Sequence, residues 1–220
     1  MNFLIKSGQG LKGEITIPGD KSISHRSIIL SSLAEGTSKI HGLLEGEDCL
    51  ATIEVFRNMG IKIINEEGIY SIEGNGLRGL DAPQKPLDFG NSGTSIRLCS
   101  GILSAQNFQS TLVGDSSLSS RPMQRIVEPL TDMGAKITSN NGTLPLNISP
   151  TDSLKSIDYL LPVASAQVKS CIMLAALYAE GVTKIEERAV TRDHTENMLK
   201  QFGIPVNVEN SDGKKRISLG

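Results

Sequence analysis

The sequence has 220 residues, which is enough for one large domain or two small ones with a buried core. Its net charge of −2 excludes a general electrostatic attraction to nucleic acid or to an anionic membrane surface. The 22 glycines, the 4% of aromatic residues and the absence of tryptophan are typical of an α/β protein with many tight turns.

The first predicted elements are two short strands at residues 3–5 and 14–17. The glycines between them have the spacing of a dinucleotide-binding turn. That turn should open a helix, and here a strand and Pro18 follow, so we reject this function. A helix is then predicted from Lys21 and Ser22 to Leu33.

The elements that follow repeat one order, in which a strand, a helix, a glycine and a strand come after each first helix. The first unit continues with a strand at 37–40, a helix at 49–58 and a strand at 61–64. The second unit has helices at 94–104 and 123–132 and strands at 110–113 and 133–137. The third unit has a helix at 166–178, a strand within 179–185, a helix starting at Thr195 and a strand within 202–206.

An internal repeat supports this order. Residues 34–40 and 179–185 are identical at five of seven positions, 145 residues apart. The glycines that end the second helices, Gly60, Gly134 and Gly203, are 74 and 69 residues apart. We therefore predict an α/β fold with pseudo-threefold symmetry, built from three repeated α/β units at about 18–80, 88–150 and 160–220.

The three cysteines are far apart and lack metal-ligand or redox spacing. The apolar run at 3–5 is too short for a signal peptide, and no apolar stretch approaches the length of a membrane span. We expect a soluble, cytoplasmic protein with reduced thiols.

The stretch 87–97 predicts a tight turn that runs into a helix. Gly90 and Gly93 let the backbone approach a ligand closely, and Asn91, Ser92 and Thr94 are suitable N-cap residues. The free N–H groups at the start of a helix can hold an anion. An ordinary capped helix remains an alternative for this stretch.

A threefold axis would bring the first helices of the three units together at their starts. The candidate anion-binding residues at these starts and in the nearby loops are Lys21, Ser22, Arg26, Asn91, Gly93, Thr94, Arg97, Arg121, Ser165, Ala166, Gln167, Lys169 and Arg192. The basic members would form a local cluster that suits a polyhydroxylated, anionic small molecule. Solvent-facing positions remain an alternative for Arg97 and Lys169, and we expect one for Arg125. His25 and His194 are second-line candidates, because an isolated histidine is more often a surface or capping residue.

Five motifs, in order, resemble those of the enolpyruvyl transferases. They lie at residues 18–26, 90–97, 120–123, 165–167 and 192–195. The resemblance covers nearly the whole chain and is closest to the branch that uses shikimate 3-phosphate. It implies one half of the enolpyruvyl transferase fold, an N-terminal domain over 1–220 whose C-terminal partner domain is missing from this chain.

The resemblance also implies a reaction. The enolpyruvyl group of phosphoenolpyruvate passes to the 5-hydroxyl of shikimate 3-phosphate, phosphate leaves, and the product feeds chorismate and aromatic amino acid synthesis. No metal or organic cofactor is implied. The missing domain would supply an acidic pair and further basic residues, so this chain alone is expected to bind shikimate 3-phosphate weakly and to be inactive.

The roles implied by the resemblance are specific to single residues. Contacts to shikimate 3-phosphate are implied for Ser22, Arg26, Ser165 and Gln167. Contacts to phosphoenolpyruvate are implied for Lys21, Asn91, Gly93, Arg121 and Gln167. Lys21 would be the catalytic residue, Arg192 is a weaker phosphate candidate, and Ala166 offers only its backbone where some relatives have a second serine. The small Gly93 implies that the complete enzyme is sensitive to the inhibitor glyphosate.

Two alternatives are kept. The sister branch that acts on UDP-N-acetylglucosamine would carry a reactive cysteine within 114–120 and an asparagine in place of Ser22, and both are lacking. A non-catalytic anion-binding module on the same scaffold is the second alternative. A nucleic-acid binder is disfavoured, since no aromatic stacking platform or basic stripe is found.

Overall fold

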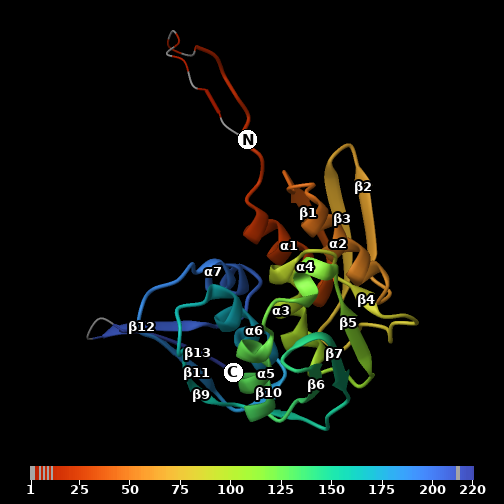
Figure 1. Ribbon diagram of the computed structural model, residues 1–220, viewed down its shortest axis with the longest axis vertical. Helices are drawn as coiled ribbons and strands as arrows, with labels where there is room; N and C mark the ends of the chain where they lie inside the picture. Colours follow the sequence, from red (N-terminus) through yellow and green to blue (C-terminus); the bar gives the residue numbers. More distant parts are fainter. Residues whose placement is uncertain (1–2, 5, 7, 9, 11, 212–213) are drawn as a thin grey trace.

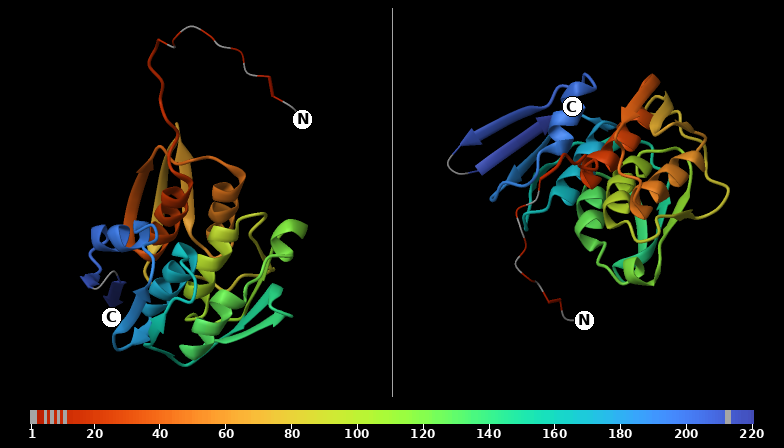
Figure 2. Two further views of the ribbon diagram at one scale, coloured as in Figure 1. Left: turned by 60° about the vertical axis from the view of Figure 1, so that its left-hand side comes forward. Right: turned by 90° about the horizontal axis from the view of Figure 1, so that it is seen from above.

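Three helices carry long runs of consecutive buried residues, which requires that each helix is surrounded by protein on all sides. These central helices are α1 (Lys21–Leu33), α3 (Gly93–Leu103) and α6 (Ala166–Ala176). In α6, every residue from Val168 to Ala176 is buried. The computed structural model describes residues 3–4, 6, 8, 10, 12–211 and 214–220, and in it the three central helices lie side by side (Figures 1 and 2).

Each central helix opens a unit in which a strand, an outer helix and a hairpin follow. The outer helices are α2 (Glu47–Arg57), α5 (Gln124–Asp132) and α7 (His194–Gln201). They bury only part of their surface, since polar residues alternate with buried ones such as Ile53 and Phe56 in α2. A short helix, α4 (Ser116–Ser119), is added in the second unit.

The three units have three separate sheets, and the second strand of each hairpin lies inside its sheet. The first sheet has the order β1-β3-β2, with β1 (Glu35–His41), β2 (Lys62–Glu66) and β3 (Ile69–Asn75). The second has the order β4-β5-β7-β6, with β4 (Leu87–Asp88), β5 (Ser110–Val113), β6 (Lys136–Asn140) and β7 (Thr143–Ser149). The third has the order β12-β13-β11-β9, with β9 (Asp158–Leu160), β11 (Thr183–Glu187), β12 (Asn207–Ser211) and β13 (Lys214–Leu219). A separate parallel pair joins β8 (Leu154–Lys155) to β10 (Ala179–Glu180).

Equivalent strands pair in equivalent ways. β1 with β3, β5 with β7 and β11 with β13 are all antiparallel, and Leu112 opposite Leu146 and Ile185 opposite Ile217 are buried pairs. These repeated sheets and central helices confirm the predicted α/β fold with three repeated units. No helix in the part of the chain that the structure describes is long and apolar enough to cross a membrane.

The strands predicted near the N-terminus are wrong where the structure describes them. Residues 14–17 have no regular structure, and Ile15 and Ile17 are 79% and 73% exposed. A strand needs a neighbour to pair its backbone groups, and among the described residues none pairs with this segment, which leads away from the units (Figure 1). Phe3 and Leu4 are also outside any strand, and Ile5 of that predicted strand lies outside the described residues.

Several further boundaries differ from the prediction, and the strand expected at 133–137 runs instead from Lys136 to Asn140 as β6. The strand expected within 202–206 begins only at Asn207, because the backbone after α7 first turns at Gly203, whose φ is +82°. The helix predicted to Tyr178 ends at Ala176, and strand β10 starts soon after at Ala179.

Close packing of α3 on α6 depends on one glycine. A Cβ atom on Gly101 would lie 2.3 Å from the carbonyl oxygen of Cys171. The two helices start together, since Thr94 contacts Gln167 near their first turns, and they are still in contact one to two turns later. They therefore run parallel, with both starts at the same end of the molecule.

Candidate anion-binding site at three helix starts

The start of α1 is held by a side-chain cap and a tight backbone approach. The carboxylate of Asp20 accepts a hydrogen bond from the backbone N–H of Ile23 at 2.8 Å. A Cβ atom on Gly19 would lie 2.0 Å from the carbonyl oxygen of Gly42, so only glycine fits there. Lys21, the first helical residue, is half exposed and forms an ion pair with Asp48 of α2.

The start of α3 is the glycine turn. Gly90 has a φ of +55°, and Ser92 caps the helix by accepting from the N–H of Ser95 at 3.2 Å. Asn91 accepts from Nη2 of Arg121 at 2.5 Å and donates through Nδ2 to Asp115 at 2.7 Å. The hydrogen bond from Asn91 lowers the pKa of Asp115.

Gly93 lies against two guanidinium groups. A Cβ atom at this position would be 2.8 Å from Nη1 of Arg97 and 3.0 Å from Nη1 of Arg121. Arg97 also donates to the carbonyl oxygen of Gly93 at 2.9 Å. Any larger residue at position 93 would therefore displace one or both arginines.

The start of α6 joins that of α3 through Gln167. Its amide nitrogen donates to Thr94 Oγ1 at 3.0 Å, and its amide oxygen accepts from Arg97 Nη1 at 3.2 Å. Ser165 caps α6 by accepting from the N–H of Val168 at 3.3 Å, and Ala166 is the first helical residue. The glycine turn and the start of α6 thus share one hydrogen-bonded set.

Arg26 joins α1 to the third unit from inside the protein. It is 4% exposed and donates through Nε to Thr195 Oγ1 and through Nη2 to Ser170 Oγ, both at 2.7 Å. Its Nη1 donates to the carbonyl oxygen of Ser22 at 2.9 Å. Burial, together with the nearby positive charge of Arg192, lowers the pKa of Arg26 to about 10.

The arginines at the site repel one another. Burial lowers the pKa of Arg97, and the positive charges of Arg121 and Arg125 act in the same direction. Arg192 approaches from the loop before α7 and donates to Ser22 Oγ at 3.1 Å. A bound anion would reduce this repulsion, so the charge distribution suits an anionic ligand.

The structure brings most of the predicted residues to the three helix starts. One set, of units one and three, comprises Ser22, Arg26 and Arg192. The other set, of units two and three, comprises Asn91, Gly93, Thr94, Arg97, Arg121 and Gln167. Arg125 is exposed, as expected.

Two predictions are corrected. Lys169 is fully buried, so it neither joins the site nor faces solvent. Its Nζ lies 3.0 Å from Oε2 of Glu187 and 2.7 Å from Oε1 of Glu196. His25 is not a surface or capping residue, because it is completely buried beside Thr52. Both side chains find partners that lie far away in the sequence.

Sequence reasoning missed Asp48, the ion-pair partner of Lys21. A usable signal was present. Asp48 lies in the first turn of the second helix of unit one, and in the repeat this position is close to those of Arg121 and Arg192, which precede the second helices of units two and three. Of the two residues that bind Arg26, Thr195 lies in the motif at 192–195 but was given no role, and Ser170 gave no signal, because single hydroxyl residues are common in helices.

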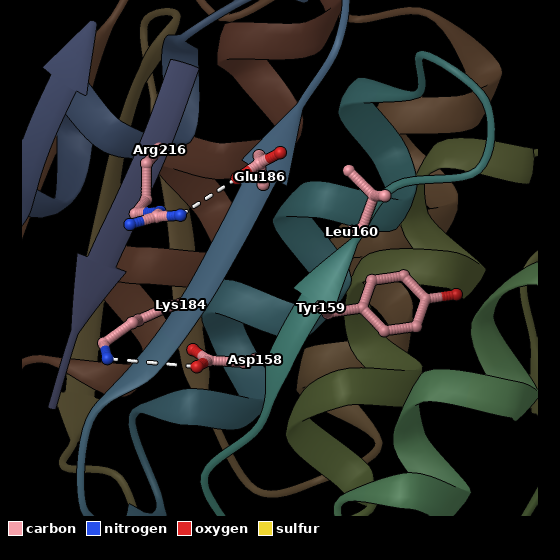
Figure 3. A pocket seen from close by; sticks show the side chains of 6 residues that line it. All are labelled: Asp158, Tyr159, Leu160, Lys184, Glu186 and Arg216. Atoms are coloured by element: carbon pink, nitrogen blue, oxygen red, sulfur yellow. Dashed lines mark hydrogen bonds and ion pairs between the residues drawn. The ribbon is translucent and has the colours of Figure 1, made fainter. Parts of the chain in front are cut away.

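A shallow pocket elsewhere on the molecule is a poor candidate for the same role. It lies on the third sheet and is lined by Asp158, Tyr159, Leu160, Lys184, Glu186 and Arg216 (Figure 3). Arg216 pairs with Glu186 at 3.0 Å, and Lys184 lies 3.9 Å from Asp158, so its charges largely neutralise each other.

Comparisons with known proteins agree on one family. A sequence model of the EPSP synthase family, described as 3-phosphoshikimate 1-carboxyvinyltransferase, matches residues 5–218. The curated protein of that name from Hydrogenovibrio crunogenus (strain DSM 25203 / XCL-2) is 55% identical over 214 residues, which covers 96% of this chain and 48% of the relative. Its counterpart from Ruthia magnifica subsp. Calyptogena magnifica is 59% identical over 206 residues and covers 94% and 47%.

A solved structure is similar over most of the chain. EPSP synthase from Acinetobacter baumannii, at 2.37 Å, has a TM-score of 0.88 and 53% sequence identity. The match covers 94% of this chain and 46% of that one. The chain therefore spans about half the length of the curated relatives and of the solved structure that it matches.

Proposed function

The chain belongs to the EPSP synthase family, and from that premise we propose that it forms the shikimate 3-phosphate half-site of a 3-phosphoshikimate 1-carboxyvinyltransferase. The whole enzyme transfers the enolpyruvyl group of phosphoenolpyruvate to the 5-hydroxyl of shikimate 3-phosphate and releases phosphate. The observation that carries the proposal is the placement of three arginines at the helix starts: Arg97 and Arg121 at the joined starts of α3 and α6, and Arg192 against Ser22 at the start of α1.

In this proposal the substrates occupy neighbouring parts of the site. Shikimate 3-phosphate contacts Ser22, Arg26, Ser165, the backbone of Ala166, Gln167 and Arg192. Phosphoenolpyruvate contacts Lys21, Asn91, Gly93, Thr94, Arg121 and Gln167. Support comes from the chemistry of these groups, since guanidinium groups and helix N–H groups bind phosphate and carboxylate, and hydroxyl and amide groups bind sugar-like hydroxyls.

Lys21 is the proposed catalytic residue. Its ammonium group is half exposed, so it is open to a ligand, and its partner Asp48 lies on the next helix. When phosphoenolpyruvate binds, the ammonium group exchanges part of its pairing with Asp48 for the ligand's negative charge. A positive charge held there stabilises the charge that develops as the tetrahedral intermediate forms and expels phosphate.

A second domain of the same enzyme completes the proposal. It is the proposed partner, since the relatives are about twice as long as this chain, and it closes the cleft over both substrates. The small Gly93, packed against Arg97 and Arg121, makes the complete enzyme a proposed target of glyphosate. A cytoplasmic location is part of the same proposal, in keeping with three free, buried cysteines.

Calorimetric titration of this chain with shikimate 3-phosphate tests the proposal, with plain shikimate as the control ligand. We expect weak, saturable binding that requires the phosphate. Arg121→Met should weaken phosphoenolpyruvate binding to the chain saturated with shikimate 3-phosphate. Arg216→Met, which removes an arginine from the third sheet, should not. Absence of binding at millimolar shikimate 3-phosphate would contradict the half-site.

An assay of the phosphate released from phosphoenolpyruvate, with shikimate 3-phosphate present, tests the need for a second domain. We expect negligible turnover by this chain alone, because catalysis requires groups preorganised on both sides of a closed cleft. Turnover at the rate of a complete enzyme would show that no second domain is needed.

A further inference from the structure

His25 sits where three helices of two units meet. It is completely buried on α1, one turn after Lys21. Its Nδ1 lies 2.8 Å from Oγ1 of Thr52 on α2, and its Nε2 lies 3.5 Å from Oγ of Ser92, the cap of α3. Thr52 Oγ1 is in turn 2.8 Å from Oγ of Ser95 on α3. These four residues are called the His25 network below.

The hydrogen bonds of the network indicate where the ring carries its hydrogen. Thr52 has one hydroxyl hydrogen. It can be donated to the carbonyl oxygen of Asp48, at 3.0 Å, or to Ser95 Oγ, which leaves the Thr52 oxygen as an acceptor for the histidine ring. An N–H on Nδ1 of His25 therefore donates to Thr52. Ser92 Oγ accepts from the N–H of Ser95, so its own hydrogen is free to be donated to Nε2 of His25. This arrangement describes a neutral ring.

The charged groups around the ring are consistent with that arrangement. Burial lowers the pKa of His25 to about 4. Asp48 on α2 raises the pKa, whereas Lys21 and Arg26 on α1 lower it. The ring thus acts as a donor and an acceptor between helices and carries no charge of its own near neutral pH.

The two residues at 25 and 26 point to different neighbours. His25 connects α1 to α2 and α3, whereas Arg26 connects α1 to Ser170 and Thr195 of the third unit. The site described above contains backbone N–H groups from two of these helix starts. His25 lies one turn below the start of α1, within hydrogen-bond distance of Ser92, the cap of α3.

We propose that His25 is a positioning residue that sets the spacing between the start of α1 and the glycine turn at the start of α3. It touches no substrate in this proposal and acts through Ser92 and Thr52. The inference rests on the proposed function only for the identity of the bound anion.

Variants of the whole 220-residue chain test this role. His25→Asn keeps a donor and an acceptor near Thr52, whereas His25→Leu keeps an apolar volume and removes both. Thr52→Val removes the partner of Nδ1 without changing the shape of the side chain. Ile148→Ala, in strand β7, is the control, since it loses a buried side chain and none of the hydrogen bonds of the His25 network.

Two measurements are made on each variant, the dissociation constant for shikimate 3-phosphate by calorimetry and the amide NMR signals of Ser22, Gly90, Gly93 and Ser95. We expect His25→Leu to weaken binding about tenfold or more and to move these signals. His25→Asn should stay within about threefold of the unaltered chain. Ile148→Ala should lower the urea midpoint with the dissociation constant unchanged.

Several outcomes would overturn the inference. One is a His25→Leu chain that binds within about twofold of the unaltered chain, and another is equal weakening by Ile148→Ala. If His25→Leu does not fold, Thr52→Val takes its place with the same expectation. If the unaltered chain binds no shikimate 3-phosphate, the proposed half-site fails. The amide signals then decide the role of His25, because unmoved signals at Gly90 to Ser95 contradict it.

Discussion

His25 makes the stability of the protein sensitive to acid. In the unfolded chain its pKa is about 6.5, and burial lowers the folded value to about 4, so the unfolded state binds the extra proton between these values. The neutral ring therefore contributes its full stability above about pH 6.5, and this contribution is lost as the pH falls toward 4. Asp48 opposes the shift, while Lys21 and Arg26 reinforce it.

Urea unfolding of the unaltered chain and of His25→Asn measures this effect. Between about pH 7 and pH 4 the unaltered chain should lose about 3 kcal/mol more of its free energy of unfolding than the variant loses. Both chains contain the same carboxylates, so the difference between the two profiles reports on His25. Parallel pH profiles for the two chains would contradict the prediction.

Lys169 is a charged residue that lies fully buried. It pairs with Glu187 and Glu196, and Lys215 also contacts Glu196 at 3.1 Å. Lys169→Met keeps the volume but leaves Glu187 without its cation inside the protein. We expect a loss of about 3–5 kcal/mol in the free energy of unfolding at neutral pH, measured by urea denaturation.

Two control variants sharpen that measurement. The double variant Lys169→Met/Glu187→Gln should recover part of the loss, because the uncompensated charge is gone. Lys184→Met removes an exposed lysine 3.9 Å from Asp158 and should cost less than about 1 kcal/mol. A loss for Lys169→Met no larger than that for Lys184→Met would contradict a structural role for the buried pair.

Packing of α3 on α6 depends on the absence of a side chain at Gly101. Alanine favours a helix over glycine by about 1 kcal/mol. The added Cβ would lie 2.3 Å from the backbone carbonyl of Cys171, which cannot rotate away, so the helices must separate. Overpacking of this kind costs about 1–3 kcal/mol and should outweigh the gain.

The free energy of unfolding of Gly101→Ala, measured in urea, checks this balance. We expect a net loss of about 1–2 kcal/mol. Ser100→Ala is the matched control at the neighbouring position and should cost less, since the Ser100 hydroxyl donates to the carbonyl oxygen of Ile96 within the same helix. A Gly101→Ala chain more stable than the unaltered one would show that the helices adjust freely.

Most helices were predictable, because apolar residues recur at helical spacing between capping residues and glycines. The inner strands β3, β7 and β13 were not predicted, because none contains a long apolar run: over seven, seven and six residues, buried residues alternate with more exposed ones. The turns of two hairpins, however, could have been predicted from the sequence. Glu67 and Asn141 have positive φ angles and precede Gly68 and Gly142, the pattern of a two-residue hairpin turn.

The candidate site was predictable to a similar degree. Residues at the helix starts, such as Asn91 and Gly93, follow from local turn and cap chemistry. The burial of Arg26, Lys169 and His25 depends on partners elsewhere in the chain. Thr195 is 169 positions from Arg26, and Ser92 is 67 from His25, so no local pattern contains these contacts.

At the scale of the whole molecule, the repeat relates three units that each contribute a central helix. The identical residues in 34–40 and 179–185 correspond to β1 and to the segment of β10 and β11, which follow α1 and α6. Sequence repetition therefore predicted which elements are equivalent. The meeting of α3 and α6 at their starts, through Thr94 and Gln167, is observed in the structure.

The parallel helices α3 and α6 have an electrostatic consequence. Each carries a macrodipole with a partial positive charge at its start, and like ends held side by side repel laterally through a poorly polarisable core. This repulsion lowers the stability of the fold, and a bound multivalent anion reduces it. At equal ionic strength, phosphate should raise the thermal unfolding midpoint above its value in chloride, and calorimetric scans in both salts would measure it. Identical midpoints would mean that the helix dipoles are already compensated within the protein, so that a bound anion relieves no repulsion between them.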